Sequence, residues 1–170
     1  MENFFCGSDG GQYYAVPAQH YLQSHLNTDK ILGYTYGYMA HEGEIRSPKA
    51  IHSQNLLYEL GGNWVCLAIA NYQETFYSTS IYSDFVRTPS DRDIEAFVSY
   101  AHSKGNKVCL KPMVNCKDNM WRAHIGFPDK NMDERDIYWN KWFDSYKHFI
   151  LHYAKLAQEL KCEMLCIGCE

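Results

Sequence analysis

The pattern of apolar and polar positions becomes regular from residue 30 onward. Apolar runs such as Trp64–Ala70 alternate with longer segments in which apolar residues recur every three or four positions. Nearly continuous apolar runs are typical of strands buried on both faces, as in parallel sheets. The pattern predicts four strands, at 30–38, 64–70, 107–114 and 164–168, and three helices, at 48–60, 89–104 and 134–160.

Start and stop signals support the first two helices. Ser47 followed by Pro48 gives an N-cap residue and a proline at the first helical position. The segment Thr88–Asp91 repeats this arrangement and adds a capping box, which places the expected N-cap at Thr88. Glycines at 61 and 105 follow the two helix ends, as helix C-termini favour.

The order βαβαβαβ demands a parallel sheet with right-handed crossovers. An open doubly wound sheet and a (β/α)8 barrel cut in half both fit. Residues 30–170 hold about three and a half units of about 40 residues, and eight such units make a barrel of ordinary length. No phosphate-binding glycine motif follows any strand. We therefore expect an α/β fold, the N-terminal half of a barrel over 30–170, preceded by an irregular extension over 1–29.

Two residues of the third predicted strand stand out. Pro112 cannot donate a hydrogen bond to a neighbouring strand, so it is expected near the strand's end or at a bulge. Lys111 precedes it in an otherwise apolar run. Its side chain either lines the barrel interior with a carboxylate partner or lies on a bulge beside Pro112.

Composition narrows the function classes. The chain has a net charge of −4 and a pI near 6.0, so it lacks the basic face of a nucleic-acid binder. Aromatic residues make up 15%, including 14 Tyr and 4 Trp. Flat rings with polar tips suit stacking on sugars, and they also fill cores. No apolar run is long enough to span a bilayer, and no membrane partner is expected.

The cysteines favour a reducing compartment. Seven is an odd number, most of them lie in apolar strand-like runs, and the sequence begins without a signal-peptide pattern. A cytoplasmic location is expected. Cys166 and Cys169 are an odd number of positions apart on a strand and therefore face opposite sides. No metal and no cofactor is expected, and a metal- or redox-active α/β domain built on these cysteines is a minor alternative.

Functional residues of a parallel α/β sheet gather at the carboxyl ends of its strands. Carboxylates, amides and aromatic rings follow each predicted strand, a set that suits a neutral, hydroxyl-rich ligand better than a phosphate. A structural role for these loop residues remains the alternative. The candidates are Tyr36, Tyr38, His41, Glu42 and Glu44 after the first strand, Asn71, Gln73 and Glu74 after the second, Asn115, Asp118, Trp121 and Arg122 after the third, and Glu170 after the fourth.

A series of short motifs in a fixed order resembles glycoside hydrolase family 113, whose best-known activity is endo-β-1,4-mannanase. The resemblance covers about residues 30–170. It is carried by Gly62-Asn63-Trp64-Val65, Thr88-Pro89-Ser90-Asp91, Ala101-His102, Leu110-Lys111-Pro112, Asn115, Trp121-Arg122, Phe149-Ile150-Leu151-His152-Tyr153-Ala154 and Ile167-Gly168-Cys169-Glu170.

The resemblance implies a retaining glycosidase in which Glu170, closing strand four, is the acid/base. It also implies that Asn115, Trp121 and Arg122 contact the sugar beside the cleaved bond. Tyr36 and Gln73, near the ends of the first two strands, are expected as further substrate contacts. The nucleophile of this clan closes strand seven, beyond residue 170. Most of the clan has Asn before the acid/base, whereas this chain has Cys169, so Asn115 is expected to bind the sugar 2-hydroxyl instead.

The leading hypothesis is therefore a β-mannanase-like hydrolase whose substrate is an oligo- or polysaccharide. The alternatives are another retaining β-glycosidase of the same clan and a non-catalytic carbohydrate-binding α/β domain. The 170-residue chain alone is expected to be inactive, and to self-associate through the edges of a half-barrel.

Overall fold

The computed structural model describes residues 4–9, 12–17, 30–127 and 132–168, and the side chains of 30–127 and 136–168. The chain divides into two units, Met1–Ile31 and Leu32–Glu170. The first contains an antiparallel pair, β1 (Phe4–Asp9) and β2 (Gln12–Pro17), in which Asp9 is the register partner of Gln12. The pair lies within the segment 1–29, for which an irregular extension is expected from the sequence. The consecutive glycines Gly10 and Gly11, between two runs that contain aromatic residues, are the sequence signal for a hairpin of β1 and β2.

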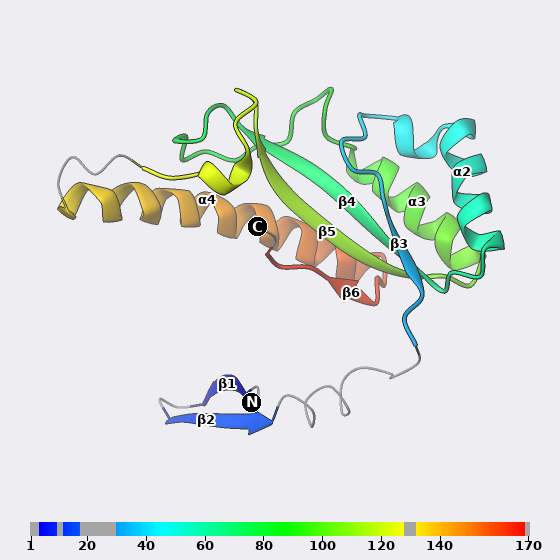
Figure 1. Ribbon diagram of the computed structural model, residues 1–170, viewed down its shortest axis with the longest axis horizontal. Helices are drawn as coiled ribbons and strands as arrows, with labels where there is room; N and C mark the ends of the chain where they lie inside the picture. The colour runs from blue at the N-terminus through cyan, green and yellow to red at the C-terminus, as the bar shows by residue number, and fades with distance from the viewer. Residues whose placement is uncertain (1–3, 10–11, 18–29, 128–131, 169–170) are drawn as a thin grey trace. The chain divides into compact units, whose positions relative to one another are not determined.

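The second unit is built on a sheet of four parallel strands in the order β3-β4-β5-β6 (Figure 1). These are β3 (Gly33–Tyr36), β4 (Trp64–Gln73), β5 (Lys107–Cys116) and β6 (Met164–Leu165), and the helices are α2 (Pro48–Glu59), α3 (Asp91–Ser103) and α4 (Met132–Glu159), with 3-10 turns η1 (Glu44–Arg46) and η2 (Arg122–His124). All the predicted strands and helices are confirmed. Among the described residues no helix is long and apolar enough to cross a membrane.

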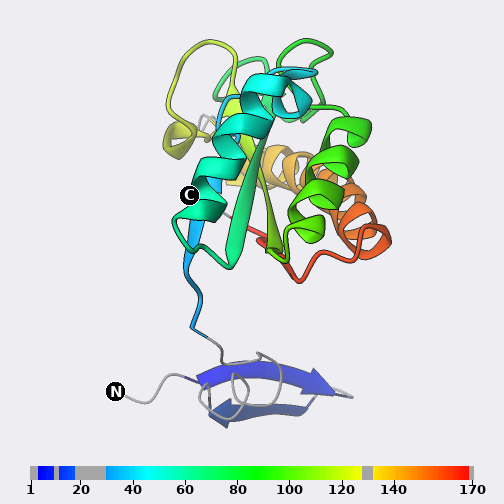
Figure 2. The same cartoon turned by 90° about the vertical axis from the view of Figure 1, so that its right-hand side faces the viewer.

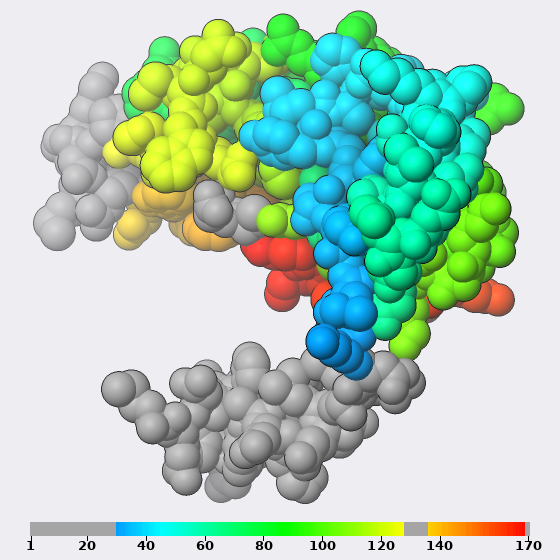
Figure 3. Space-filling view, turned by 45° about the vertical axis from the view of Figure 1, so that its right-hand side comes forward, coloured from blue at the N-terminus to red at the C-terminus, as the bar shows by residue number. Residues whose placement is uncertain are grey.

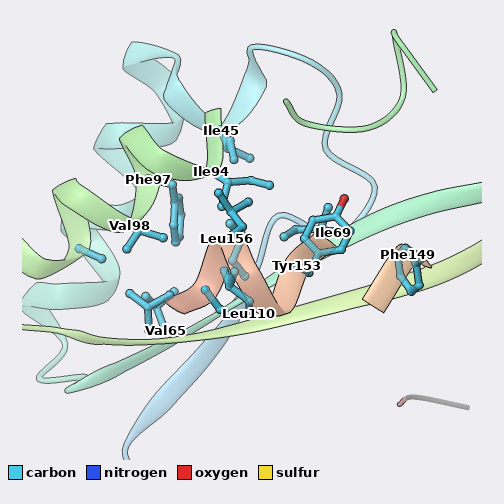
Figure 4. Packing of buried hydrophobic residues seen from close by; sticks show 14 of the residues in the cluster. Ile45, Val65, Ile69, Ile94, Phe97, Val98, Leu110, Phe149, Tyr153 and Leu156 are labelled. Atoms are coloured by element: carbon cyan, nitrogen blue, oxygen red, sulfur yellow. The ribbon is translucent and has the colours of Figure 1, made fainter. Parts of the chain in front are cut away.

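The hydrophobic core lies between one face of the sheet and the helices (Figures 2 and 4). Alternate residues of β4 and β5, such as Leu67 and Leu110, point into it and are fully buried. Phe97 of α3 and Tyr153 of α4 meet them there. The intervening residues of both strands therefore point to the opposite face, which carries no helix.

The helix starts are set by side-chain caps. Ser47 caps α2 by accepting from the N–H of Ala50, with Pro48 in the first turn, as predicted. The N-cap of α3 is Ser90 and not Thr88, and its capping box is closed by Asp93. Thr88 is buried and donates its hydroxyl to the carbonyl of Ala70 at 2.8 Å, which fixes the loop to β4 instead.

β4 and β5 extend beyond their expected ends, to Gln73 and Cys116. β4 continues to Gln73 because polar residues at its end find partners on α4: Tyr153 donates to Asn71 at 2.7 Å and the indole of Trp142 donates to Gln73 at 2.9 Å. β3 is shorter than expected, since Gly37 adopts a left-handed backbone (φ 80°) directly after Tyr36.

Pro112 lies in the middle of β5, opposite Ile69, in an unbroken register, so neither an end nor a bulge accommodates it. Even-numbered residues of β5 bond toward β6: the carbonyl of Leu110 accepts from the N–H of Cys166 at 2.8 Å. The donor that Pro112 lacks therefore faces β6 and not β4. The next bond of the β5–β6 ladder needs that donor, which explains why β6 ends at Leu165. Lys111 is not on a bulge, and its side chain belongs to the helix-free face.

Candidate functional site

The carboxyl ends of β3, β4 and β5 meet at one end of the sheet. Figure 3 shows the segment after β5, in yellow, next to the segment after β3, in blue. Asn115 of β5 is the register partner of Tyr72 of β4, and both point to the helix-free face. The amide nitrogen of Asn115 lies 3.2 Å from the sulfur of Met39, which follows β3.

Arg122, in η2, donates from Nη1 to Oδ1 of Asn115 at 3.1 Å. Trp121, the N-cap of η2, is 59% exposed, and its ring meets the edge of His124 with the centroids 5.8 Å apart. Three residues that the sequence singles out thus lie together: Asn115 and Arg122 in contact, and Trp121 beside them with its ring open to solvent.

Two residues at this end have no sequence signal of function. Tyr72 is buried and its hydroxyl lies 4.0 Å from the sulfur of Met39. Burial raises the pKa of Tyr72, against the effect of Arg87, whose guanidinium lies 5.9 Å from the ring centroid. Met39 has a left-handed backbone (φ 61°), which is unusual for a residue other than glycine. Tyr72 is linked to the site by its register with Asn115, by a hydrogen bond with the Asn115 side chain and by the contact that both residues make with Met39.

Tyr36 does not belong to this group. Its ring stacks on Phe97 of α3 with the centroids 5.5 Å apart, and its hydroxyl donates to the carbonyl of Ala50 at 3.1 Å. Burial raises the pKa of Tyr36. The side chain therefore packs between the sheet and the helices, and its expected contact with a sugar is corrected to a structural role.

Gln73 is likewise on the helix side. It is fully buried, accepts from Trp142, and donates to the carbonyl of Thr75 at 2.7 Å. Its polar side chain reads as a surface residue in sequence, but α4 covers it. The expected substrate contact by Gln73 is corrected as well.

A charged cluster joins the segments that follow β4 and β5. The amine of Lys117 lies 3.2 Å from Asp84 and 3.6 Å from Glu74, and Tyr82 donates to Glu74. The hydrogen bond with Asp84, followed by the bond with Tyr82, raises the pKa of Lys117. The backbone N–H groups of Val86 and Arg87 donate to Asp84 and lower its pKa to about 2. Glu74 is thus held by a cation and a phenol, and is not an isolated carboxylate.

Glu42, another carboxylate among the candidates after the strands, accepts from the N–H of Ser90 at 2.8 Å. It therefore helps to hold the start of α3. Glu170 and Cys169 lie outside the described residues. Within the part of the chain that the structure describes, no group of three or more His, Cys, Asp and Glu side chains could hold a metal ion.

A hollow of about 470 Å³ lies between β5, η2 and α4, lined mostly by apolar and aromatic side chains that include Trp142 and Tyr146. Val114, on its wall, belongs to the core side of β5. Tyr146 donates to the carbonyl of Ile167 at 2.8 Å across it. The hollow therefore opens mainly on the helix side of β5, and Arg122, which contacts Asn115, also belongs to its lining.

Comparison with known proteins shows what this arrangement is similar to. The sequence model of Glycoside Hydrolase Family 113 matches residues 34–170. A solved GH113 β-1,4-mannanase is 35% identical over 84% of this chain, with a TM-score of 0.75. The β-mannanase AaManA of Alicyclobacillus acidocaldarius, in complex with ManMIm, is 37% identical over 84%, with a TM-score of 0.76. No curated protein is similar enough to count as a match. The chain spans 46% of each of these two solved structures.

Proposed function

Because the chain belongs to glycoside hydrolase family 113, we propose that it forms part of an enzyme that hydrolyses β-1,4-linked mannan or manno-oligosaccharides with retention. The observation that carries the proposal is the contact of Arg122 with Asn115 beside the exposed ring of Trp121, at the carboxyl end of the sheet. Active sites of (β/α)8 barrels lie at that end.

Asn115 is proposed to bind a sugar hydroxyl, the 2-hydroxyl in particular. Arg122 fixes the amide by donating to its oxygen, which leaves the NH₂ group directed at the sulfur of Met39. A thioether is a weak acceptor, so a ligand hydroxyl that replaces it forms the stronger bond. Most of the clan makes this contact with an Asn directly before the acid/base, where this chain has Cys169. Asn115 is proposed to supply the contact instead.

Glu170 is proposed as the acid/base. It follows β6 in sequence, and β6 runs parallel to β5, which carries Asn115 at its carboxyl end. Retention requires a second carboxylate about 5–5.5 Å away that attacks the sugar while the first donates a proton to the leaving oxygen. Glu42 and Glu74 are both held in hydrogen bonds by this chain's own residues, so the nucleophile is proposed to come from a later strand of the barrel.

The proposal is tested by binding. Trp121→Ala is expected to weaken the affinity of the chain for mannohexaose by about 1–3 kcal/mol, because an exposed ring that stacks on a pyranose loses that contact. Titration calorimetry measures it, with Tyr77→Ala, another exposed aromatic residue, as the matched control. Since the Trp121 ring is largely exposed, the melting temperature is expected to change little. Unaltered affinity together with a large loss of stability would assign Trp121 to packing alone.

A second prediction separates the enzyme from a carbohydrate-binding domain without catalysis. The 170-residue chain alone is expected to bind manno-oligosaccharide but to release no reducing sugar from mannan. General acid assistance contributes a factor of about 10²–10⁴, whereas glycosidases need far more. Side chains such as Leu32, Phe143 and Leu151 are about half exposed, so oligomers are expected in size-exclusion chromatography. A monodisperse monomer that cleaves mannan contradicts the proposal and would make Glu42 or Glu74 the candidate nucleophile.

A further inference from the structure

Two cysteines face each other on the helix-free face of the sheet. Cys66 of β4 and Cys109 of β5 are register partners. Their neighbours in sequence, Val65 and Leu110 among them, point into the core, so both thiols point to the other side. The pair lies toward the amino ends of the strands, whereas Asn115 lies at the carboxyl ends. The proposed hydrolase function therefore makes no use of it.

The geometry of the pair suits a covalent bond. Adjacent strands lie about 4.8 Å apart, which is within the Cα separation of about 4.4–6.8 Å that a disulfide spans. The side chains of Cys66 and Cys109 already share a hydrogen bond, and both cysteines are free thiols. The Cα spacing of the two strands is thus compatible with a bond between the two sulfur atoms, which brings the Cβ atoms slightly closer together.

The two thiols differ in reactivity. The hydrogen bond with Cys109 lowers the pKa of Cys66 to about 7, although burial alone would raise it. The charge of Lys111 and a hydrogen bond with Thr35 lower it further. The same hydrogen bond, together with burial, raises the pKa of Cys109. Cys66 is half-buried and Cys109 is only 9% exposed. Cys66 is therefore the thiolate that attacks, and Cys109 is the protonated partner held beside it.

We propose that Cys66 and Cys109 are an oxidation-sensitive pair that a peroxide converts into a disulfide joining β4 to β5. The Cys66 thiolate attacks one oxygen of hydrogen peroxide, forms a sulfenic acid and releases hydroxide, which takes up a proton to become water. The Cys109 sulfur then displaces the sulfenic hydroxyl, which leaves with the thiol proton as a second water. In sum two thiols lose two electrons, and one peroxide is reduced to two waters.

The experiment treats the reduced chain with hydrogen peroxide and maps the tryptic peptides without reduction. The expected product is a cross-link between the peptides that carry Cys66 and Cys109, lighter than their sum by two hydrogen atoms. Because Lys111 precedes a proline, trypsin leaves Cys116 in the peptide of Cys109. Cys116→Ser is therefore the matched control: this residue lies on the same strand but on the core side, and its variant is expected to form the same cross-link.

Cys109→Ser is expected to stop the reaction at the sulfenic acid of Cys66, which dimedone captures. Because the lowered pKa leaves more of Cys66 as thiolate at pH 7 than of an ordinary cysteine, its alkylation by iodoacetamide is expected to be severalfold faster. Circular dichroism of each variant checks that the fold is kept. A cross-link that runs instead to Cys162 or Cys166, or a folded wild-type chain whose thiols all survive peroxide, overturns the proposal.

Discussion

Glu170→Ala, in a protein whose further βα units complete the barrel, is expected to lower the turnover of mannan by a factor of about 10²–10⁴. This is the usual contribution of a positioned general acid, which protonates the leaving oxygen of a natural glycoside. An aryl mannoside with an acidic phenol needs little protonation to leave. The rate at which its sugar is transferred to the enzyme is therefore expected to remain close to that of the unaltered protein.

Release of the phenol in the first turnover measures that step separately from the later hydrolysis. Glu59→Ala is the matched control, because Glu59 is an exposed glutamate at the last residue of α2, away from the carboxyl ends of the strands. It is expected to leave both rates unchanged. Equal losses on mannan and on the activated substrate would rule out the acid role of Glu170 and point to a general loss of structure.

The second large effect is expected in stability. Asp93 is fully buried, accepts from the N–H groups of Gly43 and Ser90 at 2.9 and 3.0 Å, and is paired with Arg46. Asp93→Asn puts an NH₂ group against these donors and leaves the guanidinium without its carboxylate. The free energy of unfolding is expected to fall by about 2–4 kcal/mol, as measured by the urea midpoint. Asp91→Asn, an exposed acid in the same helical turn, is expected to change it by less than about 1 kcal/mol.

The dependence of stability on pH gives an independent check. Burial opposes ionisation of Asp93, but the N–H of Gly43 and the hydroxyl and N–H of Ser90 lower its pKa to about 2, below the value of about 3.9 in an unfolded chain. Its contribution is therefore complete above about pH 4 and is lost as the pH falls toward 2. The unaltered chain is expected to lose stability more steeply over this range than Asp93→Asn. Parallel curves would show that Asp93 is not ionised in the folded chain.

Hydrophobic periodicity was sufficient to predict the strands, the helices and their parallel arrangement, because both-face burial leaves continuous apolar runs. It failed at polar residues that other elements cover. Gln73, the last residue of β4, accepts a hydrogen bond from Trp142 of α4. The sequence pattern of β4 alone does not predict a partner 69 residues further along the chain. Periodicity also leaves open which face of a strand carries the core when both are apolar. This is why Tyr36 was expected at the site although it packs on Phe97.

The candidate site was predicted only where one short segment supplies it. Asn115, Trp121 and Arg122 follow a single strand, and the structure keeps them together. Tyr72 and Met39 come from two other strand ends, and only the register of the sheet brings them near Asn115. The facing thiols of Cys66 and Cys109 have the same origin, since the positions are unrelated until β4 and β5 are aligned.

The proline of β5 has a consequence for protein engineers who wish to replace β6 with a strand taken from another barrel. A strand grafted beside β5 meets one missing donor, at Pro112, on the side where the ladder with β6 ends. If the new strand is chosen only for its length, its carbonyl opposite Pro112 has no N–H to accept from. The replacement strand is better selected for a bound water, a hydroxyl or a break at the level of Pro112. Converting Pro112 to alanine offers the alternative of a continuous seam that accepts ordinary strands.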